Sequence, residues 1–175
     1  MRYNYFLRDL NHMSQADFVA AIGHVFEHSA WIAAAAWMQR PFADRAALHQ
    51  AMVRVVASAP VEQQLGLICA HPDLAGRIMV AGELTPESSA EQAAAGLTML
   101  NAAEMERFTA YNTAYRARFG FPFVICAREH KKDAILAAFP RRLANNREQE
   151  IAAALAEIAK IAWFRVCDLI ADETP

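Results

Sequence analysis

Alanine content and proline spacing constrain the fold of this chain more than any other feature. Alanine supplies roughly a fifth of the 175 residues, and it is the strongest helix former because it loses no side-chain entropy on ordering. No series of Val-, Ile- and Thr-rich runs shows the period of two that is typical of strands. We therefore predict an all-α fold. Prolines separate segments of helical length at Pro41, Pro60, Pro72, Pro86, Pro122 and Pro140.

The predicted architecture is a single-domain bundle of about seven or eight helices over residues 1–175. Ser14, Asp44 and Thr85 stand where helix N-caps are expected, and Pro86 follows Thr85 at the first helical position. No low-complexity linker or fixed-period repeat indicates a domain boundary. The helices are expected at residues 15–28, 31–39, 43–58, 61–70, 86–100, 102–119, 131–139 and 147–170.

Composition excludes several classes of function. A net charge of −2 leaves no surplus of cations to neutralise phosphates, so we expect no nucleic acid partner. The longest apolar run, residues 30–37, is far shorter than the roughly 20 residues that cross a bilayer, and the first residues lack the layout of a secretory signal. Cys69, Cys126 and Cys167 lie far apart in apolar stretches, so we expect them to be reduced and buried. These features predict a compact cytoplasmic protein with no membrane partner.

Arg165 is the clearest anomaly in the last predicted helix. Hydrophobic residues recur there every three or four positions, and Arg165 falls on the same stripe. A guanidinium on a buried stripe must be paired or reach water, so an internal ion pair or a snorkelling side chain would explain it. Alternatively, its planar fork receives a substrate carboxylate in a pocket.

His71 ends an apolar helical segment, and Pro72 after it disfavours further helix. An imidazole there, with an unperturbed pKa of about 6.5, suits general acid–base catalysis, although a lone histidine more often has a structural role. Ser88 and Glu91 match a capping box. If the helix already begins at residue 86, however, they lie one turn apart on one face and can meet another partner.

His24 and His28 have the i, i+4 spacing of two ligands on a helix, but no third ligand follows at a telling distance and no HExxH motif is present. We therefore interpret them as a surface pair and predict no metal site. The sequence also contains no glycine-rich phosphate loop and no GxSxG elbow, which leaves nucleotide hydrolysis and serine-esterase chemistry unsupported.

Residues 119–125 read Phe-Gly-Phe-Pro-Phe-Val-Ile and cannot continue the long polar helix before them, since glycine and proline interrupt it. We expect a buried, extended loop. Its aromatic side chains either plug the core, or its backbone N–H and C=O groups face a ligand that carries amide groups of its own.

Taken together, these segments resemble one family, the OHCU decarboxylases of purine degradation, whose full name is 2-oxo-4-hydroxy-4-carboxy-5-ureidoimidazoline decarboxylase. The similarity also includes Leu10-Asn11, residues 26–31 and Asn112-x-x-Tyr115, and it covers essentially the whole chain. The order and spacing of the motifs carry the resemblance. They are His71-Pro72-Asp73-Leu74-Ala75-Gly76, Ser88-x-x-Glu91-Gln92 with Ala95-Gly96-Leu97, residues 119–124 and Ile161-Ala162-x-x-Arg165.

The resemblance implies an all-α fold peculiar to the family, a homodimer, no cofactor, and a small-molecule ureidoimidazoline substrate that is decarboxylated to (S)-allantoin and CO2. It implies His71, Glu91 and Arg165 as catalytic residues. It also implies substrate contacts from Pro72, Ser88, Gln92, Phe119, Gly120, Phe121, Phe123, Val124 and Ile125.

On this basis we expect a carboxy-lyase in which His71 acts as the general acid or base and Glu91 fixes its tautomer. Arg165 would orient the substrate and stabilise negative charge. The alternative from another class is a non-catalytic helical module that binds a purine-derived ligand or a partner protein. An enzyme of the same fold that acts on a related ureido or hydantoin acid is a second alternative.

Overall fold

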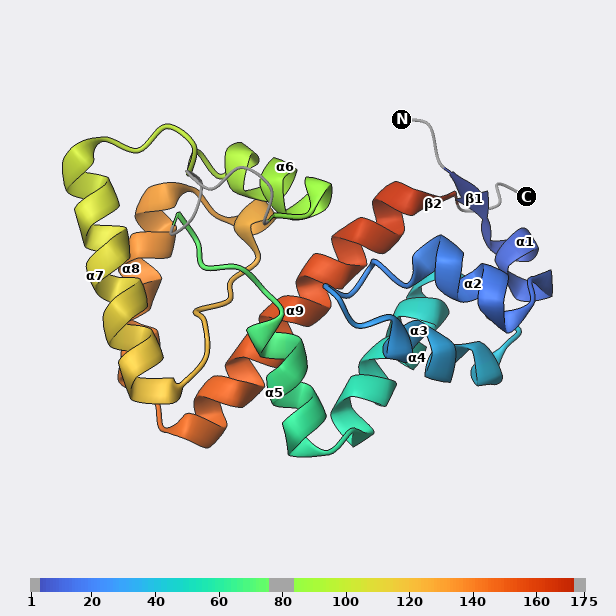
Figure 1. Cartoon of the computed structure of the whole chain (residues 1–175). Coiled ribbons are helices and arrows are strands. Elements are labelled where there is room, and N and C mark those ends of the chain that lie inside the picture. The colour runs from blue at the N-terminus through green and yellow to red at the C-terminus, as the bar shows by residue number, and fades with distance from the viewer. Residues whose placement is uncertain (1–3, 76–83, 172–175) are drawn as a thin grey trace. The chain divides into compact units, whose positions relative to one another are not determined.

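The computed structural model describes residues 4–75 and 84–171. Within these ranges it contains nine α-helices, two short 3-10 helices and two strands of two residues each, so the predicted all-α fold class is confirmed (Figure 1). The chain divides into two compact units, residues 1–70 with 162–175 and residues 71–161. The single domain over residues 1–175 stays a prediction.

The first unit is built on helices that pack through an apolar core. Helix α3 (Ala30–Ala36) packs against both α2 (Gln15–Ile22) and α4 (Arg45–Ser58). The other helical elements of this unit are α1 (Leu7–His12), η1 (Trp37–Gln39), α5 (Val61–Cys69) and the last part of α9 (Arg147–Leu169). Its fully buried side chains include Phe18, Ile22, Ile32, Leu48 and Met52.

Three sets of polar contacts hold the ends and loops of the first unit. Strands β1 (Tyr5–Phe6) and β2 (Ile170–Ala171) pair in parallel, which ties the start of the described chain to its end. Asn11 exchanges two hydrogen bonds with the backbone of Phe42, at 2.9 and 2.8 Å. The Arg40 guanidinium donates to the carbonyl oxygens of Asn11 and Met13 at 2.9 and 2.7 Å. Asn11 of the Leu10-Asn11 motif therefore has a structural role.

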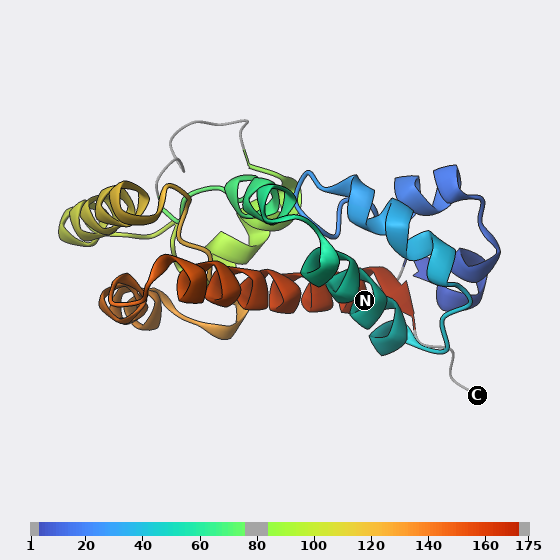
Figure 2. The ribbon, with the colours of Figure 1, turned by 90° about the horizontal axis from the view of Figure 1, so that it is seen from below.

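The second unit surrounds an aromatic core. Helix α7 (Ala102–Phe119) packs against α8 (Lys132–Leu143), as Figure 1 shows, and α6 (Pro86–Ala94) packs against η2 (Ala127–Glu129). Helix α9, the longest helix of the described ranges, contributes residues 147–161 to this unit and runs without interruption (Figure 2). The aromatic core consists of Phe108, Tyr115, Phe119, Phe121, Phe123 and Phe139.

The predicted helix starts are confirmed where a cap was identified. The side chains of Ser14, Asp44 and Thr85 accept hydrogen bonds from the backbone N–H groups three residues on, at 3.2, 2.7 and 3.3 Å. Because Thr85 caps α6, the capping-box interpretation of Ser88 is wrong. Ser88 and Glu91 instead lie one turn apart within the helix.

The predicted helix at residues 15–28 is too long. Helix α2 ends at Ile22, and the chain turns at Gly23, where an added Cβ would lie 2.5 Å from the Val19 carbonyl oxygen. His24 and His28 follow outside the helix and are exposed, so their prediction as a helical i, i+4 pair is wrong. His28 adopts a positive φ of 46°, a conformation that ends regular structure.

Other boundaries also differ from the prediction. Helix α1 lies where no helix was expected, and α8 continues past Pro140 to Leu143. Helix α6 ends at Ala94 instead of residue 100, because Gly96 takes a positive φ of 83° and Leu97 N–H donates back to the Gln92 carbonyl.

The cysteines are free in the described chain, but only Cys126 is buried. Cys69 is exposed and Cys167 is partly exposed, so the prediction that all three are buried is wrong. Cys69 is the last residue of α5 and directly follows the buried Leu67 and Ile68. Among the described residues, none of the helices combines the length and the apolar composition of a membrane span.

Candidate active site

His71 lies in the second unit, directly after α5, and is 6% exposed. The three residues that follow Pro72 are each held by a side chain from a neighbouring helix. Arg116 of α7 donates to the Asp73 carboxylate at 3.0 Å, and Asn112 donates to the Leu74 carbonyl at 2.8 Å. These contacts hold the backbone that follows His71, although residues 73 and 74 belong to no helix or strand.

Gln92 joins this segment to α6. Its Oε1 accepts a 3.2 Å hydrogen bond from the backbone N–H of Ala75, a residue with a positive φ of 55°. Ser88 and Gln92 are buried, and Glu91 between them is partly exposed. Residues 88, 91 and 92 share one face of the helix. The structure therefore joins Gln92 of α6 to the segment that follows His71, and Ser88 and Glu91 lie on the same face of α6 as Gln92. Gly76, the last residue of the motif that begins at His71, lies outside the described residues.

The loop after α7 is buried and extended, as predicted. Gly120 ends α7 with a positive φ of 81°, and residues 121–126 are buried and have no regular structure. The rings of Phe119, Phe121 and Phe123 surround Tyr115, with centroid distances of 4.8, 6.1 and 5.2 Å. The aromatic side chains of the loop therefore fill the core, which is one of the two interpretations given from the sequence. The backbone of the same loop stays a candidate for ligand contacts.

Arg165 belongs to the first unit and is 5% exposed. Its Nη1 lies 2.8 Å from Glu27 Oε2 and donates to the Val25 carbonyl at 3.4 Å. Glu27 is itself buried. The internal ion pair proposed above for Arg165 is therefore present. Glu27 was part of the recognised motif, but 138 residues of separation gave the sequence no means of pairing it with Arg165.

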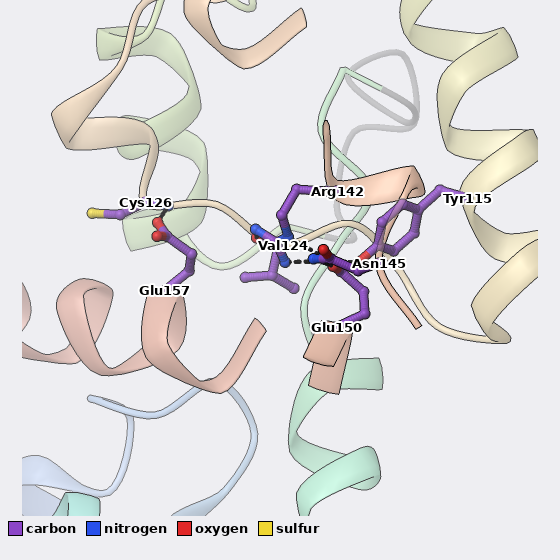
Figure 3. A network of polar contacts seen from close by, with 7 residues as sticks. All are labelled: Tyr115, Val124, Cys126, Arg142, Asn145, Glu150 and Glu157. Atoms are coloured by element: carbon purple, nitrogen blue, oxygen red, sulfur yellow. Dashed lines mark hydrogen bonds and ion pairs between the residues drawn. The ribbon is translucent and has the colours of Figure 1, made fainter. Parts of the chain in front are cut away.

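A buried polar network in the second unit was not predicted. Figure 3 shows Glu150 of α9 contacted by Tyr115 of α7, Arg142 of α8 and Asn145. One sequence signal could have revealed it. Glu150 is the first residue of a buried row along α9, and Arg165 is the last. The row has helical spacing and consists of Glu150, Ala154, Ile158, Ile161 and Arg165.

Burial and hydrogen bonding keep two groups near this network protonated. Burial raises the pKa of the Cys126 thiol to about 11, and Cys126 is therefore a poor nucleophile at neutral pH. Burial, with the neighbouring Glu150 carboxylate, raises the pKa of the Tyr115 hydroxyl well above its usual value. The Tyr115 hydroxyl thus acts as a fixed hydrogen-bond donor.

One three-residue group within the described ranges has the composition of a cation site. Ligand atoms of Glu129, His130 and Glu157 lie within 4.8 Å of one another. The Lys160 ammonium, however, lies 3.1 Å from Glu129 and 2.8 Å from Glu157. These carboxylate contacts raise the pKa of Lys160, so its positive charge already occupies the position between them.

A pocket of about 650 Å³ opens beside this group, between α8 and α9. Among the predicted substrate-contacting residues, Ile125 lines it. Arg142, Asn145 and Lys160 also form part of its wall.

Comparison with known proteins gives consistent similarity over nearly the whole chain. Residues 11–167 match the family model described as OHCU decarboxylase. A 2-oxo-4-hydroxy-4-carboxy-5-ureidoimidazoline decarboxylase from Xenopus laevis is 41% identical over 167 residues, which is 95% of each chain. A protein of the same name from Amia calva is 43% identical over 164 residues, 94% of each chain.

Among solved structures, a crystal structure of (S)-allantoin synthase is similar, with a TM-score of 0.75 and 32% sequence identity. The match covers 95% of this chain and 54% of that one, so this chain spans about half the length of that protein.

Proposed function

This chain belongs to the OHCU decarboxylase family, and from that premise we propose that it converts 2-oxo-4-hydroxy-4-carboxy-5-ureidoimidazoline to (S)-allantoin and CO2 in urate degradation. The observation that carries the proposal is the placement of a buried histidine, His71, on a backbone segment held from α6 and α7. The end-to-end similarity to decarboxylases of about the same length supports the reaction type.

The substrate can supply its own electron sink. It carries a carboxylate and a hydroxyl on one ring carbon, next to a ring C=N bond. When the carbon–carboxylate bond breaks, its electron pair forms a new bond to the neighbouring carbon, and the C=N pair moves onto nitrogen. Protonation of that nitrogen, loss of the hydroxyl proton and protonation of the neighbouring carbon then give the N–H, the carbonyl and the new C–H bond of allantoin. This chemistry requires no cofactor as electron acceptor.

In this proposal His71 accepts the hydroxyl proton as carbonyl character develops at the carbon that loses CO2. Glu91 orients the imidazole and stabilises its positive charge, as a carboxylate does beside a catalytic histidine. The hydrogen bonds to Asp73, Leu74 and Ala75 support this role, because general catalysis requires a base held within hydrogen-bond reach of the proton it removes.

The remaining predicted residues would orient the substrate. Glu27 holds Nη1 of Arg165, so the guanidinium has a fixed orientation from which to bind a negatively charged or carbonyl oxygen. Gln92 would contribute as a donor through Nε2, because its Oε1 holds the Ala75 N–H. Further contacts would come from Ser88, Pro72 and the backbone of residues 119–125. Such fixed contacts would present one face of the ring to the incoming proton and thus yield one enantiomer.

We also propose, from what the family resemblance implies, that the protein is a cytoplasmic homodimer. The three free cysteines support a reducing compartment. Light scattering of the purified protein tests the assembly, for which we expect a mass of twice 19.4 kDa.

The reaction is tested by generating the unstable substrate in place from urate with the two upstream enzymes and following the product by circular dichroism. We expect a rapid signal for (S)-allantoin that depends on the concentration of this protein. Decay at the uncatalysed rate to racemic product would contradict the proposal and favour the non-catalytic binding module.

A further inference from the structure

Glu150 is a fully buried carboxylate that receives donors from three directions. Arg142 places Nε and Nη2 2.5 Å from Glu150 Oε1, and Asn145 Nδ2 donates to Oε2 at 2.7 Å. The Tyr115 hydroxyl also donates to Oε1. Figure 3 shows these side chains converging on one carboxylate from different elements of the second unit. A buried charge with this many partners fixes the positions of all of them.

Arg142 connects the carboxylate to the loop after α7. Its Nη1 donates to the Val124 carbonyl at 3.3 Å, and its guanidinium lies over the Phe123 ring, 5.1 Å from the centroid. Glu150 binds Nε and Nη2 of the same guanidinium. The guanidinium therefore cannot rotate away from the loop without breaking the ion pair with Glu150.

Tyr115 connects the same carboxylate to the aromatic side chains of the loop. Its hydroxyl is held by Glu150, and its ring contacts Phe119, Phe121 and Phe123. Glu150 therefore acts on the loop through two side chains and does not itself contact it in the interactions shown.

A second carboxylate of α9 holds the end of the loop. Glu157 lies seven residues, two helical turns, after Glu150, and its Oε2 accepts a 2.8 Å hydrogen bond from the Cys126 backbone N–H. One face of α9 therefore holds the loop at two points, Val124 through Arg142 and Cys126 directly (Figure 3).

We propose that Glu150, acting through Arg142 and Tyr115, is a positioning residue for the decarboxylation. It holds the loop of residues 121–126 in the one conformation in which its backbone N–H and C=O groups meet the amide groups of the substrate. This inference rests on the proposed function, and it adds three residues to which no role in the reaction is otherwise assigned.

The proposal predicts a specific kinetic pattern. The amide groups of the ring and ureido chain bind the loop in both the ground state and the transition state, so weakening these contacts raises KM more than it lowers kcat. A purely structural role would instead reduce the fraction of folded enzyme, which lowers the apparent kcat and leaves KM unchanged.

The main test is Arg142→Lys, which keeps a positive charge near Glu150 but removes the fork that reaches Val124. We expect KM to rise about 5- to 10-fold and kcat to change less than about 3-fold. Tyr115→Phe, which removes a single hydroxyl, should raise KM in the same direction by a smaller factor. Glu150→Gln is the direct variant, but it leaves Arg142 unpaired and can fail to fold, so the other two variants carry the test.

Matched controls exist elsewhere in the chain. Arg40→Lys removes guanidinium contacts to three carbonyls in the first unit, and Tyr111→Phe removes a hydroxyl one turn earlier on α7. Both should leave KM at the wild-type value. Amide hydrogen exchange supplies a readout independent of activity, and we expect faster exchange at residues 121–125 in Arg142→Lys than in Arg40→Lys.

The outcomes separate the two proposals. If the wild-type protein produces (S)-allantoin but Arg142→Lys and Tyr115→Phe keep wild-type KM values and loop exchange, the positioning role is overturned and the proposed function stands. If the wild-type protein does not turn over the substrate, both proposals fail.

Discussion

At the scale of single residues, the candidate base gains its position from neighbours in space. His71 follows the end of α5, and the backbone beyond it is held by Arg116, Asn112 and Gln92. The sequence pointed to His71 because Pro72 ends the helix there. It could not identify the three side chains that hold the segment, since they come from helices 17 to 43 residues further along the chain.

His71→Asn tests the general base. Asparagine keeps a polar side chain but cannot accept and return a proton near neutral pH, so we expect kcat/KM to fall about 10²- to 10⁴-fold. Because the contacts of Asp73, Leu74 and Ala75 remain, we expect the variant to stay folded. Steady-state kinetics with circular dichroism detection measures the loss, and His24→Asn at an exposed position is the control. Full activity of His71→Asn would remove histidine from the mechanism.

The cysteines give a second test at this scale. Cys69 is exposed, whereas Cys126 is buried with its pKa raised to about 11. Alkylation requires the thiolate and access to it, so iodoacetamide at about pH 8 should modify Cys69 first and leave Cys126 unmodified in the folded protein. Peptide mass spectrometry identifies the labelled residue. Equal labelling of Cys69 and Cys126 before unfolding would contradict the burial of Cys126.

At the scale of helices and loops, local sequence signals were reliable at the helix starts where a cap was identified, Ser14, Asp44 and Thr85. Helix α7 was predicted with its observed bounds, and its end was predicted from the glycine and proline of the loop that begins at Gly120. The prediction was wrong for α2, which ends at Ile22 where Gly23 fits against the Val19 carbonyl. It was also wrong at Pro140, where helix α8 continues and its last turn includes Arg142, which pairs with Glu150. In both cases a single residue was misjudged, since Gly23 ends its helix and Pro140 does not end the helix that contains it.

The start of α7 allows a test of one such local signal. The Asn101 side chain accepts from Glu104 N–H at 2.9 Å, and Glu104 accepts from Asn101 N–H at 2.9 Å. Asn101→Ala removes half of this capping box and should lower the free energy of unfolding by about 1 kcal/mol. For a protein of this size, that loss corresponds to a fall in Tm of roughly 2–4 °C. Differential scanning calorimetry measures it, and an unchanged Tm would show that the cap contributes nothing to α7.

At the scale of the whole molecule, the motifs that identified the family include residues that do not belong to the predicted site. Asn11 holds Phe42, Asn112 holds Leu74, and Tyr115 donates to Glu150. The predicted site residues could be named from the sequence because their motifs are short and local. The partners of Arg165 and Glu150 could not be named from the sequence. Each ion pair joins residues from separate parts of the chain, and a sequence gives no distances.

The same buried polar groups make the stability of the molecule sensitive to alkaline pH. The folded protein holds Cys126 and Tyr115 in their neutral forms, because burial and, for Tyr115, the Glu150 carboxylate raise their pKa values. Contacts with Glu157 and Glu129 raise the pKa of Lys160 as well. Each group therefore binds its proton more tightly in the folded than in the unfolded state. Its stabilising contribution is complete below the unfolded pKa and is lost as the pH rises toward the folded pKa.

We therefore expect the free energy of unfolding to decrease from about pH 9 upward, and Cys126 alone, with a pKa of about 11, contributes on the order of 2–3 kcal/mol to the decrease. Urea unfolding at several pH values from about 8 to about 11 measures the slope. Cys126→Ala removes the titrating thiol and should make this slope less steep, whereas Cys69→Ala, at an exposed thiol, should leave it unchanged. A free energy of unfolding that stays constant over this range would mean that the thiol of Cys126 and the hydroxyl of Tyr115 are not held neutral by the fold.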